Sequence, residues 1–411
     1  MSQEALQRLL LDLLSSHRTV TQSDLDVLSD ADWAQLLELA HQHRLHALLH
    51  WQFNDKFAAL VVPETVRARC ADVFQRGTLR ALAVQRALVQ AVRLLDAAGI
   101  PCIALKGAFL AFGAYPQPAL RPLRDLDLLV TRHQALAAYA ALVSAGFTRS
   151  DNPDDYSPEG CLTDKKHLPP LRDPGAMFSI ELHTRVTLPE EGEAGGFEGT
   201  GLWMRRITRQ FAGQEIAYLS GTDLLLHLIY HAAYDHHLEN GPLTLVDIAW
   251  LLRTTPIDWP RFWQQAHTSG WTRGSLLLLA LTRHYFEDAE ISFEGVATDE
   301  VAEATRYAQV AAPLIARPPF SRGTKFAISL AGKSPWQSLA NVAGRVLPSR
   351  STLAAQFPEA RGAGGLALAY ARNIVRALTV KLPRVVRDAH KSSARRQRRQ
   401  ALELEHWLRP G

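Results

Sequence analysis

The sequence predicts an α+β fold in which a small mixed β-sheet is embedded in a mostly helical chain. Long stretches toward both ends repeat apolar residues with the period of a helix, whereas the middle segment contains short apolar or alternating runs typical of strands. At about 150 residues per domain, 411 residues suffice for two or three domains. We expect an N-terminal helical region (1–98), an α/β core (99–220), a C-terminal helical domain (221–346), and a linker with a basic tail (347–411).

The N-terminal region predicts long helices. Ser29 is a suitable N-cap for one helix over residues 29–53, whose apolar residues recur at nearly helical spacing. A second helix is expected from about Pro63 to Ala98, because Pro63 suits a first turn and Gly99 suits a helix end.

The middle of the chain predicts strands, and the later part predicts helices again. IPCIALKG, LDLLV and the alternating FSIELHTRV are the expected strands. Loop-rich stretches separate them, including SDNPDDYSPEG and PEEGEAGGFEGTG. The expected C-terminal helices lie at 222–238, 243–252, 271–287 and 299–316, and a linker is expected at 347–365.

Composition excludes several classes of protein. With 47% apolar and 21% charged residues, the chain is globular in composition rather than disordered or collagen-like. No apolar run approaches the roughly 18 residues that cross a bilayer, and the amphipathic start of the chain carries Glu4 and Asp12, unlike a signal peptide. Three widely spaced cysteines offer neither a disulfide framework nor a CxxC metal site. We therefore expect a cytoplasmic protein.

The net charge of +4 is concentrated near the C-terminus. Ten basic residues and one acid lie in 372–399, so this segment carries +9 and the rest of the chain carries −5. A solvated, partly helical tail is the simplest interpretation. Apolar residues between the basic ones also fit an element that docks on a protein or a membrane surface. Nucleic acid is a less favoured partner, because no aromatic residues accompany the arginines.

The densest cluster of chemically active residues lies between residues 105 and 130. Because alternate residues of a strand share a face, Asp125 and Asp127 point the same way. Two carboxylates roughly 7 Å apart at Cα can hold one divalent cation, and Mg²⁺ or Mn²⁺ suits them. A DxD pair alone is weak evidence, since a solvated acid at the start of a strand explains it as well.

Two further features strengthen this interpretation. Lys106 and Gly107 end an expected strand and open a helix, where free backbone N–H groups suit a phosphate. The alternating segment then brings a third acid, Glu181, and His183 onto one strand face. A single glutamate on a polar strand face is equally often solvated.

Together these motifs resemble the polymerase-β-like nucleotidyltransferase superfamily, and most closely its bacterial family of uncharacterised nucleotidyltransferases. That family's pattern has an LKG motif, a tyrosine, an arginine ahead of an Asp-x-Asp strand, an Ile/Val-Glu-Leu-His strand and a His-rich helix. This sequence has Leu105-Lys106-Gly107, Tyr115, Arg121, Asp125-Leu126-Asp127-Leu128-Leu129-Val130, Ile180-Glu181-Leu182-His183 and DLLLHLIYHAAYDHH, followed by LTLVDIAWLL. The resemblance covers about residues 30–260. Lys106-Gly107 replaces the Gly-Ser of the wider superfamily.

The resemblance implies an enzyme that moves a nucleoside monophosphate, with AMP the expected case, from ATP or another NTP to an acceptor hydroxyl. Asp125, Asp127 and Glu181 are implied as ligands of Mg²⁺ or Mn²⁺, with Glu181 also serving the acceptor. The implied phosphate-binding residues are Lys106, Gly107, Arg121 and Arg124, since guanidinium forks match phosphate oxygens. Both arginines also fit a surface or salt-bridge role.

A second set of candidates lies on the expected helices. His227 and His231 share a helix face, but HxxxH without an adjacent Glu is a weak zinc signal. Asp247 lies in an apolar segment and needs a partner, so we expect it to pair with a histidine or an arginine across a helix interface. The candidates for an acceptor pocket are His183, His227, His231 and Asp247, each of which also suits a structural polar network.

Three alternatives remain open. A glycosyltransferase also uses DxD, but there the apolar strand precedes the motif. A nucleotide-binding or scaffold protein with a degenerate site is less favoured, because all three acids are present. A toxin–antitoxin type nucleotidyltransferase shares the chemistry and differs only in its acceptor. The expected partners are an NTP and an unidentified acceptor, which is a small molecule, a peptide or a protein.

Overall fold

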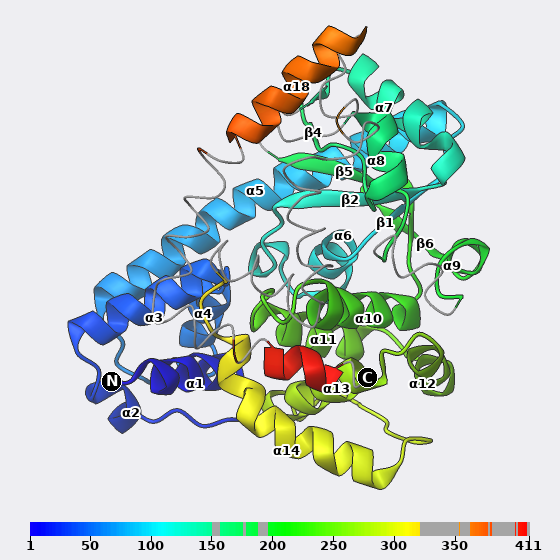
Figure 1. The fold of residues 1–411 in the computed structure, drawn as a ribbon. Helices are drawn as coiled ribbons and strands as arrows, with labels where there is room; N and C mark the ends of the chain where they lie inside the picture. Colours follow the sequence, from blue (N-terminus) through cyan, green and yellow to red (C-terminus); the bar gives the residue numbers. More distant parts are fainter. Residues whose placement is uncertain are drawn as a thin grey trace.

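The computed structural model describes residues 1–149, 157–175, 178–187, 196–320, 362–376 and 402–408, together with residues 353, 379 and 399. Figure 1 shows a β-sheet formed by the middle of the chain, with the N-terminal helices and the later helices arranged around it. The predicted α+β fold is confirmed.

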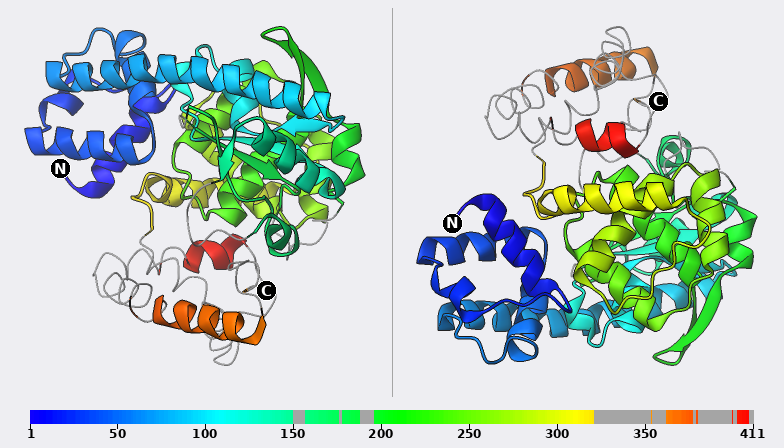
Figure 2. Two further views of the ribbon diagram at one scale, coloured as in Figure 1. Left: turned by 90° about the horizontal axis from the view of Figure 1, so that it is seen from above. Right: turned by 90° about the horizontal axis from the view of Figure 1, so that it is seen from below.

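Five helices form the N-terminal region: α1 (Gln3–Leu14), α2 (Gln22–Asp26), α3 (Asp30–Gln42), α4 (His46–Asn54) and α5 (Glu64–Ala97). As predicted, Ser29 caps α3, and the carboxylate of Asp32 accepts a hydrogen bond from the Ser29 N–H in return. Pro63 precedes α5, and Gly99 follows it with a φ of +69° that glycine tolerates. Figure 2 shows α5 extending from these helices along the sheet.

The prediction of one continuous helix over residues 29–53 is wrong. The helix stops at Gln42 and α4 begins at His46, because Arg44 adopts a left-handed φ of +61°. Both helices bury apolar residues, so the apolar repeat passes through the break without a signal.

Seven strands form one sheet in the order β3-β4-β5-β2-β1-β7-β6. They are β1 (Cys102–Ala104), β2 (Asp125–Val130), β3 (Thr148–Arg149), β4 (Leu171–Arg172), β5 (Ser179–His183), β6 (Ile207–Phe211) and β7 (Gln214–Tyr218). The sheet is mixed: β2 pairs in parallel with β5 and β1 with β7, while the other neighbours are antiparallel. The three predicted strands are the central β1, β2 and β5.

The helices that accompany the sheet are α6 (Gly107–Phe109), α7 (Ala135–Ser144), α8 (Pro158–Asp164) and α9 (Thr200–Met204). The C-terminal helices are α10 (Gly221–Tyr230), α11 (Leu243–Thr254), α12 (Trp259–Thr268), α13 (Thr272–Tyr285) and α14 (Thr298–Ile315). The helix predicted over 222–238 is shorter than expected, because α10 passes into a π-helical turn over His231–Asp235 and then ends. Leu238, at the end of the predicted helix, has a left-handed φ of +64°.

The C-terminal tail is described only in part. Helix α18 (Gly362–Arg376) begins inside the predicted linker, so residues 362–365 belong to a helix rather than to a linker. Most of the basic segment 372–399 lies outside the described residues, and its partner prediction stays untested. None of the described helices is both long and apolar enough to cross a membrane.

Candidate active site

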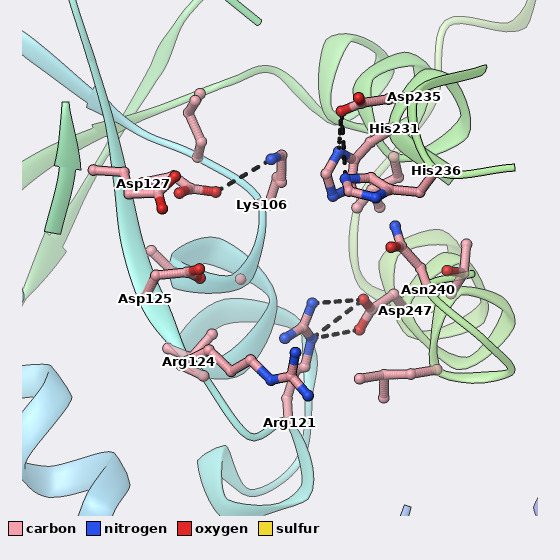
Figure 3. Close-up of a pocket in the computed structure, with 18 of the residues that line it drawn as sticks. Lys106, Arg121, Arg124, Asp125, Asp127, His231, Asp235, His236, Asn240 and Asp247 are labelled. Atoms are coloured by element: carbon pink, nitrogen blue, oxygen red, sulfur yellow. Dashed lines mark hydrogen bonds and ion pairs between the residues drawn. The ribbon is translucent and has the colours of Figure 1, made fainter. Parts of the chain in front are cut away.

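A pocket of about 450 Å³ lies between the sheet and the α10–α11 segment. One side is formed by the β1–α6 turn together with β2 and β5, and the opposite side by residues from His231 to Asp247. Figure 3 shows side chains from both sides pointing into the space between them. The α3–α4 corner contributes Arg44.

The three acids predicted to act together line this pocket. In the parallel pairing of β2 with β5, Asp127 lies directly opposite Glu181, so their side chains emerge from the same face of the sheet. Ligand atoms of Asp127, Glu181 and His183 all lie within 4.8 Å of one another. Asp125 precedes them on the same face of β2 and extends into the pocket beside Asp127 (Figure 3).

This acidic cluster carries more negative charge than its neighbours balance. The Lys106 ammonium is 3.2 Å from Asp127 Oδ2, and His183 Nε2 is 3.2 Å from Asp127 Oδ1 and 3.5 Å from Glu181 Oε2. Burial works against ionisation of Asp127, but Lys106 and His183 hold its pKa well below the usual range. Burial and repulsion from Asp127 and Glu181 instead raise the pKa of Asp125. A further cation at this point would relieve that repulsion.

Lys106 and Gly107 form the turn between β1 and α6. Lys106 has a left-handed φ of +39°, and its ammonium faces the acids rather than solvent. A Cβ on Gly107 would approach Leu123 Cδ2 to 2.3 Å, so the end of the Leu123 side chain would have to move to admit any larger residue here.

Arg121 and Asp247 form a buried ion pair at the other end of the pocket. Arg121 Nε and Nη2 donate to the two Asp247 oxygens at 2.8 and 2.9 Å, and the Tyr115 hydroxyl donates to Asp247 Oδ1 at 2.7 Å. The pairing expected for Asp247 is confirmed, with an arginine as the partner. Arg121 therefore enters the pocket with its charge already balanced, whereas Arg124 is exposed at the pocket rim.

The helical side of the pocket carries a second cluster. Asp235 Oδ2 is contacted by Lys166 Nζ, by His231 Nδ1 at 3.0 Å and by His236 Nε2 at 3.5 Å. His231, Asp235 and His236 also offer ligand atoms within 4.8 Å of one another. His227, which the sequence grouped with His231, lies buried behind the lining. Burial and the nearby Lys106 hold the pKa of both His227 and His231 well below the usual value.

A sequence model of the family described as "Uncharacterised nucleotidyltransferase" matches residues 29–287, well over half of the chain. The chain belongs to this nucleotidyltransferase family. The matched range contains the sheet and the whole pocket lining, from Arg44 to Asp247. No curated protein and no solved structure shows a significant match to the chain.

Membership makes this chain a transferase that uses an NTP, and enzymes of this kind usually need a divalent metal. The donors present fit such a metal, since the carboxylates of Asp125, Asp127 and Glu181 are the hard oxygen ligands that Mg²⁺ and Mn²⁺ prefer. Their unbalanced charge is a structural reason for a cation at this point of the nucleotidyltransferase.

Several lining residues of the nucleotidyltransferase escape sequence reasoning: Arg44, Lys166, His167, His236 and Asn240. His167 lies 3.7 Å from Glu181 and its ring centroid is 5.2 Å from that of His183. The KKH run at 165–167 looks like an ordinary polar loop, and the DHH run at 235–237 belongs to the expected His-rich helix without marking His236 as a site residue. Arg44 carries no signal at all, because only the left-handed backbone at the α3–α4 corner directs it to the pocket.

Proposed function

We propose that this nucleotidyltransferase transfers AMP from ATP to a hydroxyl group of a small molecule, peptide or protein, releasing pyrophosphate. The single observation that supports this most is the excess of carboxylate charge at Asp125, Asp127 and Glu181, in a pocket that also contains Lys106 and three arginines. An acidic point beside a basic lining suits a metal-bound triphosphate better than a neutral ligand.

Asp125, Asp127 and Glu181 would hold Mg²⁺ or Mn²⁺, which when bound supplies positive charge for the phosphates and acidifies the acceptor hydroxyl. His183 donates between Asp127 and Glu181 and so keeps both carboxylates turned toward the pocket. Glu181 is proposed to accept the proton of the acceptor hydroxyl, since its carboxylate lies at the edge of the cluster and is less enclosed than that of Asp127.

Lys106, Gly107, Arg121 and Arg124 are proposed to contact phosphate oxygens. Lys106 is suited to this because its ammonium lies in the pocket beside Asp127, one of the proposed metal ligands. Arg121 is the most constrained of these four residues, because its ion pair with Asp247 fixes the orientation of its guanidinium group.

The acceptor is proposed to bind on the side of the second cluster, near Glu181, His183 and His231. Asp235 orients the His231 ring by accepting from Nδ1, which leaves the other ring nitrogen to the pocket. Of the other two sequence candidates, His227 lies behind this wall, whereas Asp247 lines the other end of the pocket and pairs with Arg121. The cytoplasmic location stays a prediction.

ATP labelled at a single phosphorus tests this proposal. The protein is incubated with Mg²⁺ and either α-labelled or γ-labelled ATP, with candidate acceptors followed by intact mass. We expect an acceptor mass increase of one AMP, the α label on the acceptor and the γ label in pyrophosphate. Transfer of the γ label with release of ADP would indicate a kinase, and a gain of a sugar from an added nucleotide sugar would indicate a glycosyltransferase. Loss of Mg²⁺-dependence, with ATP bound equally well without the metal, would indicate a nucleotide-binding or scaffold protein with a degenerate site.

A further inference from the structure

The α3–α4 corner places an arginine where local structure favours glycine. Helix α3 ends with the Arg44 N–H donating to His41 O at 3.1 Å and the Leu45 N–H donating to Ala40 O at 2.7 Å. This pair of hydrogen bonds is the Schellman motif, and its left-handed residue is Arg44, with φ +61°. Glycine is the usual residue there because it has no Cβ to strain. Strained positions of this kind gather at functional sites.

The side chain of Arg44 leads from this corner into the active-site pocket. It is half-buried and lines the pocket together with Arg121 and Arg124. Burial, followed by the charges of these two arginines, lowers the pKa of Arg44 to about 10. Within the part of the chain that the structure describes, its guanidinium makes no hydrogen bond and no ion pair.

Two guanidinium groups at this end of the pocket have no ion-pair partner among the described residues. Asp247 neutralises Arg121 through a two-pronged ion pair. Neither Arg44 nor Arg124 has such a partner among the described residues. Figure 3 shows Arg121 and Arg124 at the end of the pocket away from the His231–Asp235 cluster. Beyond the effect of burial, the charge of Arg124 lowers the pKa of Arg44 against the opposing effect of Asp247 and Asp125, so an anion bound between the two guanidinium groups would relieve their repulsion.

We propose that Arg44 and Arg124 form a diphosphate-binding subsite, so that the N-terminal helical region supplies a binding residue to the active site. A guanidinium fork matches two phosphate oxygens, and two forks match two linked phosphate groups. Resting on the proposed function, the diphosphate is the β,γ portion of the NTP and then the pyrophosphate that leaves. The subsite explains why the α3 corner keeps arginine in spite of its left-handed backbone.

Replacing Arg44 by glycine separates the local cost of the residue from its binding role. Isothermal titration with inorganic pyrophosphate and with ATP, both with Mg²⁺, is compared with thermal unfolding of the same proteins. Arg44→Gly should have a Tm equal to or above that of the wild type, yet bind both ligands at least about tenfold more weakly. Arg44→Lys should bind with intermediate affinity. Arg69→Ala, which removes an exposed arginine of α5, is the control and should match the wild type.

The two ligands identify the source of the diphosphate. Weaker binding of both supports a subsite shared by the NTP and the product, whereas weaker binding of pyrophosphate alone supports the subsite for the free anion. Wild-type affinity of Arg44→Gly for both ligands, or no pyrophosphate binding by the wild type, would overturn the proposal. A chain that binds pyrophosphate through Arg44 but transfers the γ label in place of the α label would refute the proposed function and leave the subsite standing.

Discussion

Two buried carboxylates at opposite ends of one pocket have very different surroundings. Asp247 accepts three hydrogen bonds from Arg121 and one from Tyr115, so the charges of Asp247 and Arg121 balance each other within the protein. Asp127 has Lys106 and His183 as partners, but Asp125 and Glu181 crowd the same point, and burial together with repulsion from Asp127 and Glu181 raises the pKa of Asp125. We call the Asp247 cluster closed, because its charges balance within the protein. We call the Asp127 cluster open, because a further cation would relieve the repulsion among its carboxylates.

The contrast separates structural charge from functional charge. A closed buried pair is satisfied without a ligand, so its loss should disturb folding first. An open cluster stores repulsion that a ligand relieves, so its loss should disturb function first. Replacing one acid in each cluster should therefore affect mainly stability in the Asp247 cluster and mainly activity in the Asp127 cluster.

Asp125→Asn should show the largest effect, on function alone, because burial and repulsion from Asp127 and Glu181 already raise the pKa of this acid. The change removes one anion from an overcrowded group, and we expect nucleotidyl transfer to fall at least about 10³-fold, roughly 4 kcal/mol in activation free energy. The free energy of unfolding should change by less than about 1 kcal/mol. Pyrophosphate release and urea unfolding measure the two effects, and Mg²⁺-dependent ATP binding is the readout if no acceptor is at hand. Full activity in this variant would remove the distinction between the two clusters.

Asp247→Asn should instead have its largest effect on stability, with weaker phosphate binding following from the released Arg121 guanidinium. It leaves the Arg121 guanidinium buried without a counter-charge, which costs about 3–5 kcal/mol of stability. The double variant Arg121→Met, Asp247→Leu should recover most of this loss, because two apolar side chains of similar size need no pairing. Urea midpoints at pH 7 provide the comparison. A single variant as stable as the wild type would mean that the closed pair contributes no more to folding than the open cluster.

Histidine titration gives the smallest effect and extends the comparison to the N-terminal helices. Burial lowers the pKa of His43 to about 4, whereas the acids around His183 raise its pKa. Because the unfolded His43 takes up a proton near pH 6.5 and the folded one does not, its stabilising contribution is complete above that pH and declines toward pH 4. At pH 5 the loss is on the order of 2 kcal/mol.

Urea unfolding between pH 7 and pH 5 checks this expectation. His43→Gln cannot titrate, so it should lose less stability over that range than the wild type. His267→Gln, which changes an exposed histidine of α12, is the matched control. Parallel pH curves for His43→Gln and the wild type would contradict a neutral buried imidazole at this position.

The sequence by itself determined the features that depend on neighbours along the chain. Alternation placed Asp125 with Asp127 and Glu181 with His183, and the cap at Ser29 marked the start of α3. These predictions succeed because strand and helix periods are properties of the local backbone. The order of the motifs also identified the nucleotidyltransferase family that the comparison then confirmed.

Only the tertiary structure decided which distant residues meet. Asp247 bonds to Arg121 across 126 positions of sequence, and Asp235 meets Lys166 across 69. The π-helical turn after α10 brings His236 to the pocket while His227 stays behind it, although His227 has the better spacing to His231. Likewise, one left-handed residue turns Arg44 from an ordinary helix position into the pocket. Such contacts depend on how the sheet and helices pack and on rotations at single residues, and neither leaves a periodic trace in the sequence.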